Sequence, residues 1–315
     1  MAPDMPHHDT SRPSSAAPAE RPARLAVGVI GVGRVGSVLG AALAMAGHRV
    51  VAASGVSDGS RERAEALLPD VPLVAPQDVP ASADLVLLTV PDDALPGLVE
   101  GLVATGSVRA GQLVAHVSGR YGVGVLDPAT AAGALPLAMH PVMTFTGTTV
   151  DLARLAGCPF GVTAPEPLRP VVEALVVEMG GEPSWVPEER RALYHAALAN
   201  ASNHLVTLIS QSMELLRSAG VDEPGRMLGP LAGAALDNAL RSGDGALTGP
   251  VARGDAGTVA AHLTELASVS GEALTAYVAM ARLTADRALA AGILTPAAAE
   301  ALLDVLADRS DGAHA

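Results

Sequence analysis

Short apolar runs alternate with stretches of helical periodicity over the first 187 residues of the chain. Runs rich in valine, leucine and isoleucine predict strands at residues 25–30, 48–54, 83–90, 112–117 and 138–142, with short extra strands at 73–74, 160–163 and 184–186. Helical periodicity predicts a first helix that Gly47 closes and further helices at residues 60–68, 94–104 and 168–179. Strands that alternate with helices predict an α/β fold with a doubly wound parallel sheet.

From residue 188 onward the pattern is helical throughout, with predicted helices at residues 188–219, 225–241, 255–267, 270–291 and 296–308. Thr295 before Pro296 is a typical helix start, because a hydroxyl caps the helix and proline is tolerated at its first position. We therefore expect an α/β domain over residues 24–187, with its core at 24–150, and an all-helical C-terminal domain over residues 188–308. Residues 1–23, rich in proline, alanine and serine, are predicted to be a disordered tail, and residues 309–315 a second tail.

A glycine-rich turn joins the first predicted strand to the first predicted helix. It consists of Gly31, Val32, Gly33, Arg34, Val35 and Gly36. In such a turn the first glycine permits a tight bend, the second lets a pyrophosphate approach the backbone, and the third lets the helix pack against the strand. The free N–H groups at the helix N-terminus then hold the phosphates. The pattern predicts a dinucleotide-binding Rossmann domain whose cofactor contacts these six residues; the alternative is a glycine turn without a ligand.

The end of the second predicted strand bears on the choice between NADP and NAD. An acidic residue there would bind the ribose 2′-hydroxyl of NAD, but the chain has Ser54, and the nearest acid, Asp58, lies beyond the strand. Arg61 and Arg63 follow, and hydroxyls with nearby arginines suit a phosphate. We therefore favour NADP, bound partly by Ser54 and Arg61, with NAD as the alternative. Solvated helix charges are the other interpretation of the two arginines.

Several polar residues follow predicted strands and should meet at the carboxyl edge of the sheet, where doubly wound folds bind their ligands. Val90 and Pro91 end one strand, and we expect them to contact the cofactor. Ser118 and Gly119 end the next strand, and His140 lies in the strand after it. We expect Ser118 and His140 to lie at this ligand-binding edge, and the resemblance described below implies that they contact the substrate. The alternatives are an ordinary serine-glycine turn and a histidine that binds a loop carbonyl.

Charge and composition exclude several functions. The net charge of −13 argues against nucleic acid as a partner, because phosphate binding needs basic clusters. All 20 basic residues are arginine, which excludes a catalytic lysine or a Schiff base. The single cysteine, Cys158, excludes an intrachain disulfide and fits a reducing compartment. No apolar run approaches a membrane span, and residues 1–23 lack the apolar core of a secretory signal, so we expect a cytoplasmic protein.

We expect no metal site. His116, His204 and His262 lack the helical spacing of a ligand pair, and no cysteine cluster accompanies them.

The motifs assembled above resemble a known group of proteins. The segments are VIGVGRVGSVLGAALAMAGH, LTVPDDAL, HVSGRYGVGVL, AMHPVMTF, ALYHAALANASNHLVTL and ALTGPVARGDAGTVAAHL. They resemble bacterial proteins that join a Rossmann-like domain to a DUF2520 domain, and these in turn resemble pyrroline-5-carboxylate reductases, the F420-dependent NADP reductase family and β-hydroxyacid dehydrogenases. The resemblance implies a nicotinamide-dependent oxidoreductase. One departure is Gly55, which stands directly after Ser54 where the group would have an arginine.

The resemblance implies that the catalytic residue lies at the start of the long interdomain helix, where YHAALANASN stands. Because lysine is absent, histidine is the natural proton donor near neutral pH. On a helix His195 and Asn203 share one face. We expect His195 to donate the proton and Asn203 to orient the substrate. The alternative is that Tyr194 and His195 pack between the domains.

The segment ALTGPVARGDAGT resembles the substrate loop of pyrroline-5-carboxylate reductase. The resemblance implies that Thr248 and Arg253 bind substrate, since arginine pairs in two places with a carboxylate. The rival interpretation is that Arg253 pairs with Asp255, although Asp255 is also expected to cap the next helix.

These expectations combine into a reductase that uses NADP and acts on a small carbonyl or imine compound with a carboxylate, with ketopantoate (2-dehydropantoate) as the leading substrate. A second hypothesis is an enzyme of the prephenate dehydrogenase type that uses His140. A third is a sensor or regulatory dimer that binds NADP without catalysis. Long helices poor in charge and rich in alanine often bury a face against another subunit, so we expect a homodimer formed through the helical domain.

Overall fold

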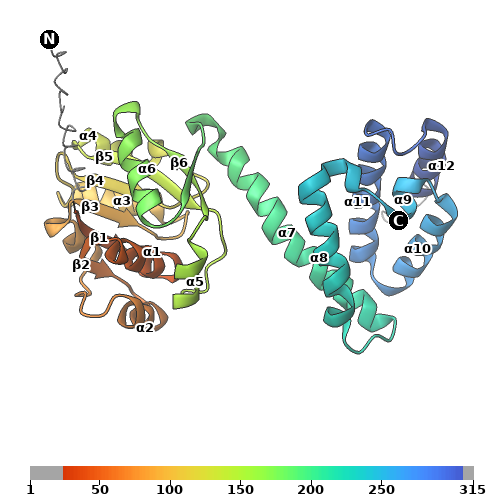
Figure 1. Cartoon of the computed structure of the whole chain (residues 1–315), viewed down its shortest axis with the longest axis horizontal. Coiled ribbons are helices and arrows are strands. Elements are labelled where there is room, and N and C mark those ends of the chain that lie inside the picture. Colours follow the sequence, from red (N-terminus) through yellow and green to blue (C-terminus); the bar gives the residue numbers. More distant parts are fainter. Residues whose placement is uncertain (1–23, 308–315) are drawn as a thin grey trace, which may run out of the picture. The chain divides into compact units, whose positions relative to one another are not determined.

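The computed structural model describes residues 24–307, so the tails expected at 1–23 and 309–315 lie outside the described residues. The described residues fall into two compact units that divide between Leu198 and Ala199, inside helix α7 (Arg191–Ser218). The first unit, red to green in Figure 1, contains the sheet, and the second, cyan to blue, is helical. This is the expected α/β fold followed by a helical C-terminal region.

The first unit contains a seven-stranded sheet with the order β2-β1-β3-β4-β5-β6-β7. The strands are β1 (Ala26–Ile30), β2 (Arg49–Ser54), β3 (Leu85–Leu88), β4 (Leu113–His116), β5 (Leu135–Pro141), β6 (Pro159–Thr163) and β7 (Glu182–Trp185). Neighbouring strands from β2 to β5 pair in parallel, but β6 runs antiparallel to β5, and β7 is parallel to β6. The sheet is therefore mostly parallel rather than parallel throughout.

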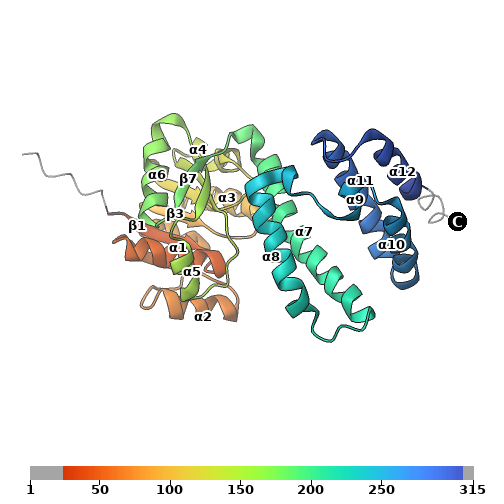
Figure 2. The same ribbon diagram turned by 45° about the vertical axis from the view of Figure 1, so that its right-hand side comes forward.

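Helices cover both faces of this sheet. They are α1 (Arg34–Met45), α2 (Asp58–Leu67), α3 (Leu95–Ala104), α4 (Asp127–Ala131), α5 (Thr149–Arg154) and α6 (Arg169–Glu178), with 3-10 helices η1 (Pro76–Ser82), η2 (Val123–Leu126), η3 (Glu166–Leu168) and η4 (Glu188–Arg190). Side chains of β3 alternate between the faces: Leu85 and Leu87 pack with α1 and α6, whereas Val86 and Leu88 pack with α3. Figure 2 shows α1 and α6 on one side of the strands and α3 on the other.

The strand order places β1 between β2 and β3. The chain leaves β1 toward β2 and then returns past β1 to build β3, so the order of strands reverses at this point. In open α/β sheets, the crevice beyond the carboxyl ends of the strands at such a switch point is where ligands bind. The glycine turn after β1 and the loop after β3 flank this crevice.

The second unit contains the rest of α7 together with α8 (Pro224–Ser242), η5 (Gly243–Ala246), α9 (Gly249–Arg253), α10 (Ala256–Val269), α11 (Gly271–Ala290) and α12 (Pro296–Ala307). Its buried core is formed by side chains of α9 to α12, such as Leu263 and Leu302. Asp255 caps α10 by accepting the amide of Thr258, and α12 starts at Pro296, as expected. Within residues 24–307, none of the helices combines the length and the apolarity needed to span a bilayer.

The structure corrects some expected elements. Leu73 forms an isolated bridge with Ala53 rather than part of a strand, because Pro72 and Pro76 remove backbone donors on both sides of the segment. The strand expected at residues 138–142 begins earlier, at Leu135, where it pairs with Leu113 of β4. The segment around Arg253, which resembles a substrate loop, contains the short helix α9.

Candidate functional site

The glycine turn after β1 is closed by backbone hydrogen bonds to the end of β2. The amides of Gly31 and Val32 both donate to the carbonyl oxygen of Ser54, at 2.9 Å each. Gly31 has a φ of 102°, a left-handed conformation that favours glycine. A Cβ at Gly31 would also lie 3.0 Å from the backbone of Thr89. Ser54 thus holds the turn through its backbone, while its side chain is buried.

Thr89, directly after β3, locks the same turn from the other side. Its hydroxyl donates to the carbonyl oxygens of Gly31 at 2.6 Å and Ile30 at 3.1 Å. A Cβ at Gly36 would collide with the Gly31 carbonyl and with this hydroxyl, so α1 can pack here only with glycine at that position. The sequence analysis missed Thr89; the available signal was its place in the LTVPDDAL segment.

Gly33 differs from the other two glycines of the turn because the space beside it is open. An added Cβ would meet only the Gly31 carbonyl, at 3.9 Å. Gly33 is also the N-cap of α1, and no side chain caps the helix. The first amides of α1 therefore lack side-chain partners at the positive end of the helix dipole, which is the arrangement that binds a phosphate.

A pocket of about 410 Å³ opens beside this helix N-terminus, entirely within the first unit. It is lined by Gly33, Arg34, Val35, Thr89, Val90, Pro91, Asp92, Val117, Ser118, Gly119, His140 and His195. These residues come from the turn after β1, the loops after β3 and β4, the end of β5 and the start of α7. The structure therefore brings together half of the expected cofactor residues with Ser118 and both candidate histidines, while Gly31, Val32 and Gly36 form the turn behind them.

Two imidazole rings meet at Gly119 in this pocket. A Cβ at Gly119 would lie 2.8 Å from Cδ2 of His195 and 3.0 Å from Nε2 of His140. Both rings can therefore occupy these positions only because residue 119 is glycine. The centroids of the two rings are 6.1 Å apart. The chemistry available here is hydrogen bonding and proton transfer from either histidine to one polar group of a bound molecule.

His140 is held neutral by its surroundings. Burial, together with the neighbouring His195 and Arg191, lowers its pKa to about 4, whereas the carboxylate of Asp92 acts in the opposite direction. Nδ1 of His140 lies 2.9 Å from the hydroxyl of Tyr194. His140 therefore enters the pocket as an uncharged imidazole with one of its nitrogens already engaged.

Arg191 anchors the start of α7 to the sheet. Its side chain is buried, and it donates to the hydroxyl of Thr163 at 2.8 Å and to the carbonyls of Gly161 at 3.0 Å and Ala138 at 3.4 Å. Burial lowers the pKa of its guanidinium. Nη1 has no hydrogen-bond partner within residues 24–307. No local sequence signal distinguishes Arg191 from its neighbours in EERR, so sequence reasoning missed it.

Ser118, which was expected to contact the substrate, also stabilises the loop that follows it. Its hydroxyl accepts the amides of Arg120 and Tyr121, both at 3.2 Å, while its own amide donates to Nδ1 of His116. His116 is fully buried, and burial lowers its pKa to about 4, so it is neutral and donates from Nε2 to the carbonyl of Gly122 at 2.8 Å. The serine lines the pocket and forms a turn at the same time.

The two arginines expected near a 2′-phosphate have different surroundings. Arg61 forms an ion pair with Asp58 at 2.7 Å on the exposed surface of α2. Arg63 instead donates to Gly59 and packs against Gly147, where an added Cβ would lie 2.8 Å from its side chain and 3.1 Å from Cα of Arg34. Arg63 therefore lies near the glycine turn.

Gly55 has a steric reason for replacing the arginine that the resemblance led us to expect. A Cβ at this position would lie 2.7 Å from Cγ2 of Val32 and 3.0 Å from Cβ of Ser60. Packing between the glycine turn and α2 thus excludes a side chain directly after Ser54.

The remaining expected residues belong to the second unit. Asn203 is exposed on α7, Thr248 is the N-cap of α9, and Arg253 is the last residue of that helix. The carboxylate of Asp255 accepts both the amide and the hydroxyl of Thr258, at 3.0 and 2.6 Å. Across the described range, no ion pair joins Asp255 to Arg253, so their expected alternative pairing is absent from the structure.

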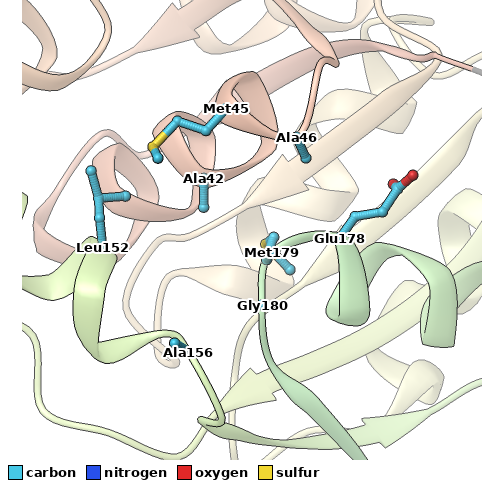
Figure 3. A pocket seen from close by; sticks show the side chains of 8 residues that line it. All are labelled: Ala42, Met45, Ala46, Leu152, Ala156, Glu178, Met179 and Gly180. Atoms are coloured by element: carbon cyan, nitrogen blue, oxygen red, sulfur yellow. The ribbon is translucent and has the colours of Figure 1, made fainter.

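A second hollow of about 320 Å³ lies at the opposite end of α1 (Figure 3). Its apolar lining includes Met45 from α1, Leu152 from α5 and Met179, and Glu178 is its only ionisable side chain. Glu178 already pairs with His48 and Arg24. The helix dipole is negative at this end, so the hollow is unsuited to phosphate. In the described part of the chain, no group of three or more His, Cys, Asp and Glu side chains could hold a metal ion.

Both parts of the chain match family models of known protein domains. Residues 10–141 match the family model of a Rossmann-like domain, and residues 158–284 match that of DUF2520, a domain of unknown function. No curated protein matches the chain.

Solved structures share the fold. Protein BF3122 from Bacteroides fragilis, provisionally named as an NADP oxidoreductase, is 21% identical with a TM-score of 0.69, and the match covers 84% of this chain and 98% of that one. Protein TM1727 from Thermotoga maritima is 23% identical with a TM-score of 0.63, over the same shares of the two chains. Pyrroline carboxylate reductase from Plasmodium falciparum, solved with NADP bound, is 11% identical with a TM-score of 0.53, again covering 84% and 98%.

Proposed function

Because the chain belongs to the proteins that join a Rossmann-like domain to a DUF2520 domain, we propose that it is an NADP-dependent oxidoreductase. Its proposed substrate is a small carbonyl or imine compound that carries a carboxylate, with ketopantoate as the leading candidate. One observation carries the proposal: the uncapped N-terminus of α1 and two imidazoles open into the same pocket at the switch point of the sheet.

The residues present fit a dinucleotide. The open space beside Gly33 gives a pyrophosphate access to the first amides of α1, and Val90 and Pro91 continue the pocket from there. No acid stands at the end of β2, where NAD would be bound through its ribose hydroxyls. Because Arg61 is paired with Asp58, we assign the 2′-phosphate to Arg63, with Ser54 holding the turn through its backbone.

The chain's own groups supply the rest of the chemistry. The nicotinamide supplies or accepts the hydride when the cofactor is bound. His195 donates a proton to the oxygen or nitrogen atom that gains electron density, because it lines the pocket beside Gly119. Ser118 and His140 contact the substrate in the same pocket. Asn203, Thr248 and Arg253 lie in the second unit, and the resemblance alone supports their proposed roles: Asn203 orients the substrate, Thr248 binds it, and Arg253 binds its carboxylate.

The test is oxidation of NADPH by the purified full-length protein with ketopantoate and pyrroline-5-carboxylate, together with reduction of NADP⁺ with prephenate. We expect the variant His195→Ala to lose about 10²- to 10⁴-fold in rate, the usual contribution of acid–base catalysis. His204→Ala is the matched control, because His204 lies on the same helix but bonds Asn200 and does not line the pocket. Full activity of His195→Ala would exclude His195, and failure to bind NADPH and NADH would refute the proposed function.

We further propose a homodimer formed through α7 and α8. Within α7 only Arg191 is buried, and within α8 only Pro224. The exposed large apolar side chains of these helices are Leu193, Leu205, Val206, Leu208, Met227, Leu231, Leu236 and Leu240. The exposed fractions of Leu231 and Leu240 are 69% and 80%, far more than a core of this unit would leave in water. A second copy fits, because a twofold axis buries the same apolar surface on both chains.

Light scattering tests the dimer. We expect a dimer for the native protein and a monomer for Leu231→Glu, because a buried carboxylate in an apolar interface has no partner. Leu303→Glu on α12 is the control, since Leu303 is also exposed but lies outside the proposed interface. A monomeric native protein would refute the dimer.

A further inference from the structure

His140 and Tyr194 form a pair that the proposed function has so far not used. Tyr194 lies in the first turn of α7, one residue before His195, and its hydroxyl is 2.9 Å from Nδ1 of His140. The rings meet edge to face at 89°, with centroids 5.7 Å apart. Because the two residues are 54 positions apart in the chain, this contact exists only where α7 meets β5.

The direction of the hydrogen bond follows from the partners of the phenol. Burial raises the pKa of Tyr194, although the charge of Arg191 opposes this, so the phenol keeps its proton. Across residues 24–307, Nδ1 of His140 is the acceptor available to the phenol proton. Tyr194 is therefore the donor, and Nδ1 accepts.

The tautomer of His140 follows from this direction. A neutral imidazole carries one proton, and an Nδ1 that accepts leaves the proton on Nε2. Nε2 faces Gly119, and within the described residues it makes no hydrogen bond. The charge of Arg191, which lies 5.7 Å from the centre of the Tyr194 ring, acts against a second proton on His140. His140 thus presents a single N–H group to the pocket.

We propose that Tyr194 is a positioning residue that fixes His140 as a neutral hydrogen-bond donor, whose Nε2–H binds the accepting atom of the substrate while His195 supplies the proton. The proposal rests on the proposed function for the identity of the substrate. The tautomer itself is a property of the free protein. Two histidines of the same pocket would then have separate roles, because only one of them is locked by a neighbouring hydroxyl.

The test uses the variant Tyr194→Phe, which removes the hydroxyl and keeps the ring beside Arg191. The first measurement is the NMR spectrum of ¹⁵N-histidine in the full-length protein, with His140 assigned from the variant His140→Gln. We expect the Nε2–H tautomer of His140 in the native protein and a mixture of tautomers or exchange broadening in Tyr194→Phe. A native His140 that carries its proton on Nδ1, or a tautomer unchanged in Tyr194→Phe, would overturn the proposal.

The chain offers a matched control in the second unit. The hydroxyl of Tyr277 lies 2.9 Å from Nδ1 of His262, with ring centroids 5.8 Å apart at 86°. Neither residue lines the pocket. Tyr277→Phe therefore removes the same kind of hydrogen bond, and we expect it to leave the His140 signals and all reaction rates unchanged.

Kinetic measurements distinguish a failure of the role of Tyr194 from a failure of the proposed oxidoreductase function. With an active substrate, we expect kcat of Tyr194→Phe to fall about 10- to 100-fold, part of the usual gain from acid–base catalysis, while the Kd for NADPH stays unchanged. A second variant, Gly161→Ala, should lower kcat similarly, because its Cβ would collide with the phenol oxygen. An unchanged kcat in Tyr194→Phe would overturn the role of the pair. If the native protein shows no activity at all, the proposed function fails, and the NMR result still decides the tautomer.

Discussion

The variant Gly33→Ala tests cofactor binding without a large effect on the stability of the fold. Gly33 has a φ of −74° and a ψ of −157°, at the edge of the extended region open to alanine, and the added Cβ would meet nothing closer than the Gly31 carbonyl at 3.9 Å. An alanine in place of glycine reduces the entropy of the unfolded chain, which stabilises by about 0.4–1 kcal/mol. Alanine is also a poorer N-cap than glycine, which offsets this gain. We therefore expect the free energy of unfolding of Gly33→Ala to stay within about 1 kcal/mol of the native value.

The same methyl group would occupy the space through which a pyrophosphate reaches the amides of α1. A hydrogen bond to a charged group contributes about 1.5–3 kcal/mol, so loss of one such bond raises the Kd for NADPH about 10- to 100-fold. Gly36→Ala provides the opposite case, because its Cβ would collide with the Gly31 carbonyl and the Thr89 hydroxyl. Overpacking of this kind costs about 1–3 kcal/mol of stability. The two variants should therefore differ in which property they lose.

Titration calorimetry with NADPH and urea unfolding measure the two properties. The single tryptophan, Trp185 at the end of β7, reports unfolding of the first unit by fluorescence. Gly97→Ala on α3 is the control, since nothing lies within 4 Å of a Cβ there. A Kd for Gly33→Ala within twofold of native would refute the placement of the pyrophosphate at α1.

Three further predictions test other parts of the site. Arg63→Ala should raise the Kd for NADPH about tenfold or more and leave the Kd for NADH unchanged. Arg61→Ala breaks only the exposed ion pair with Asp58 and should change neither Kd. Calorimetry with both cofactors measures these values, and an effect of Arg61→Ala alone would reverse our assignment. Thr89→Val removes the hydroxyl that bonds Gly31 and Ile30, and should lower the free energy of unfolding by about 1 kcal/mol in urea; equal stability would show that the turn closes without it. The buried neutral His116, whose pKa is lowered to about 4, binds its proton less readily in the folded than in the unfolded chain, so its contribution to stability is complete above pH 6.5 and is lost as the pH falls toward 4. His116 should account for up to about 3 kcal/mol of the fall in the free energy of unfolding over this range, and His140 adds a fall of its own. A smaller dependence on pH in His116→Gln would identify the group, and an unchanged one would refute its role.

Much of the cofactor end of the site could be predicted because its determinants are local in sequence. The glycine turn, the strand before it and the helix after it form one continuous segment. The positive φ of Gly31 and the collision of a Cβ at Gly36 with the Gly31 carbonyl both arise within that segment. Helix ends followed the same logic, since Asp255 and Pro296 act within a single turn of their helices. Apolar periodicity likewise predicted the strands and helices, because it reports which side of each element is buried.

The direction of a strand and the partners of a side chain are not local. β6 has the apolar character of its neighbours but runs antiparallel to β5, because direction depends on the path of the connecting chain. Thr89 is 58 residues from the Gly31 carbonyl that it binds, so its place in the LTVPDDAL segment marks the end of a strand but does not identify its hydrogen-bond partner.

The amino-acid sequence by itself therefore determined the α/β fold, the glycine turn and the two histidines as candidates. Only the tertiary structure decided that Gly119 brings both rings together, that Arg191 is buried beneath carbonyls of β5 and β6, and that Tyr194 bonds His140. The physical reason is that short-range patterns report burial and backbone conformation. A hydrogen bond between two distant elements depends instead on how the sheet and α7 pack, which no single segment encodes.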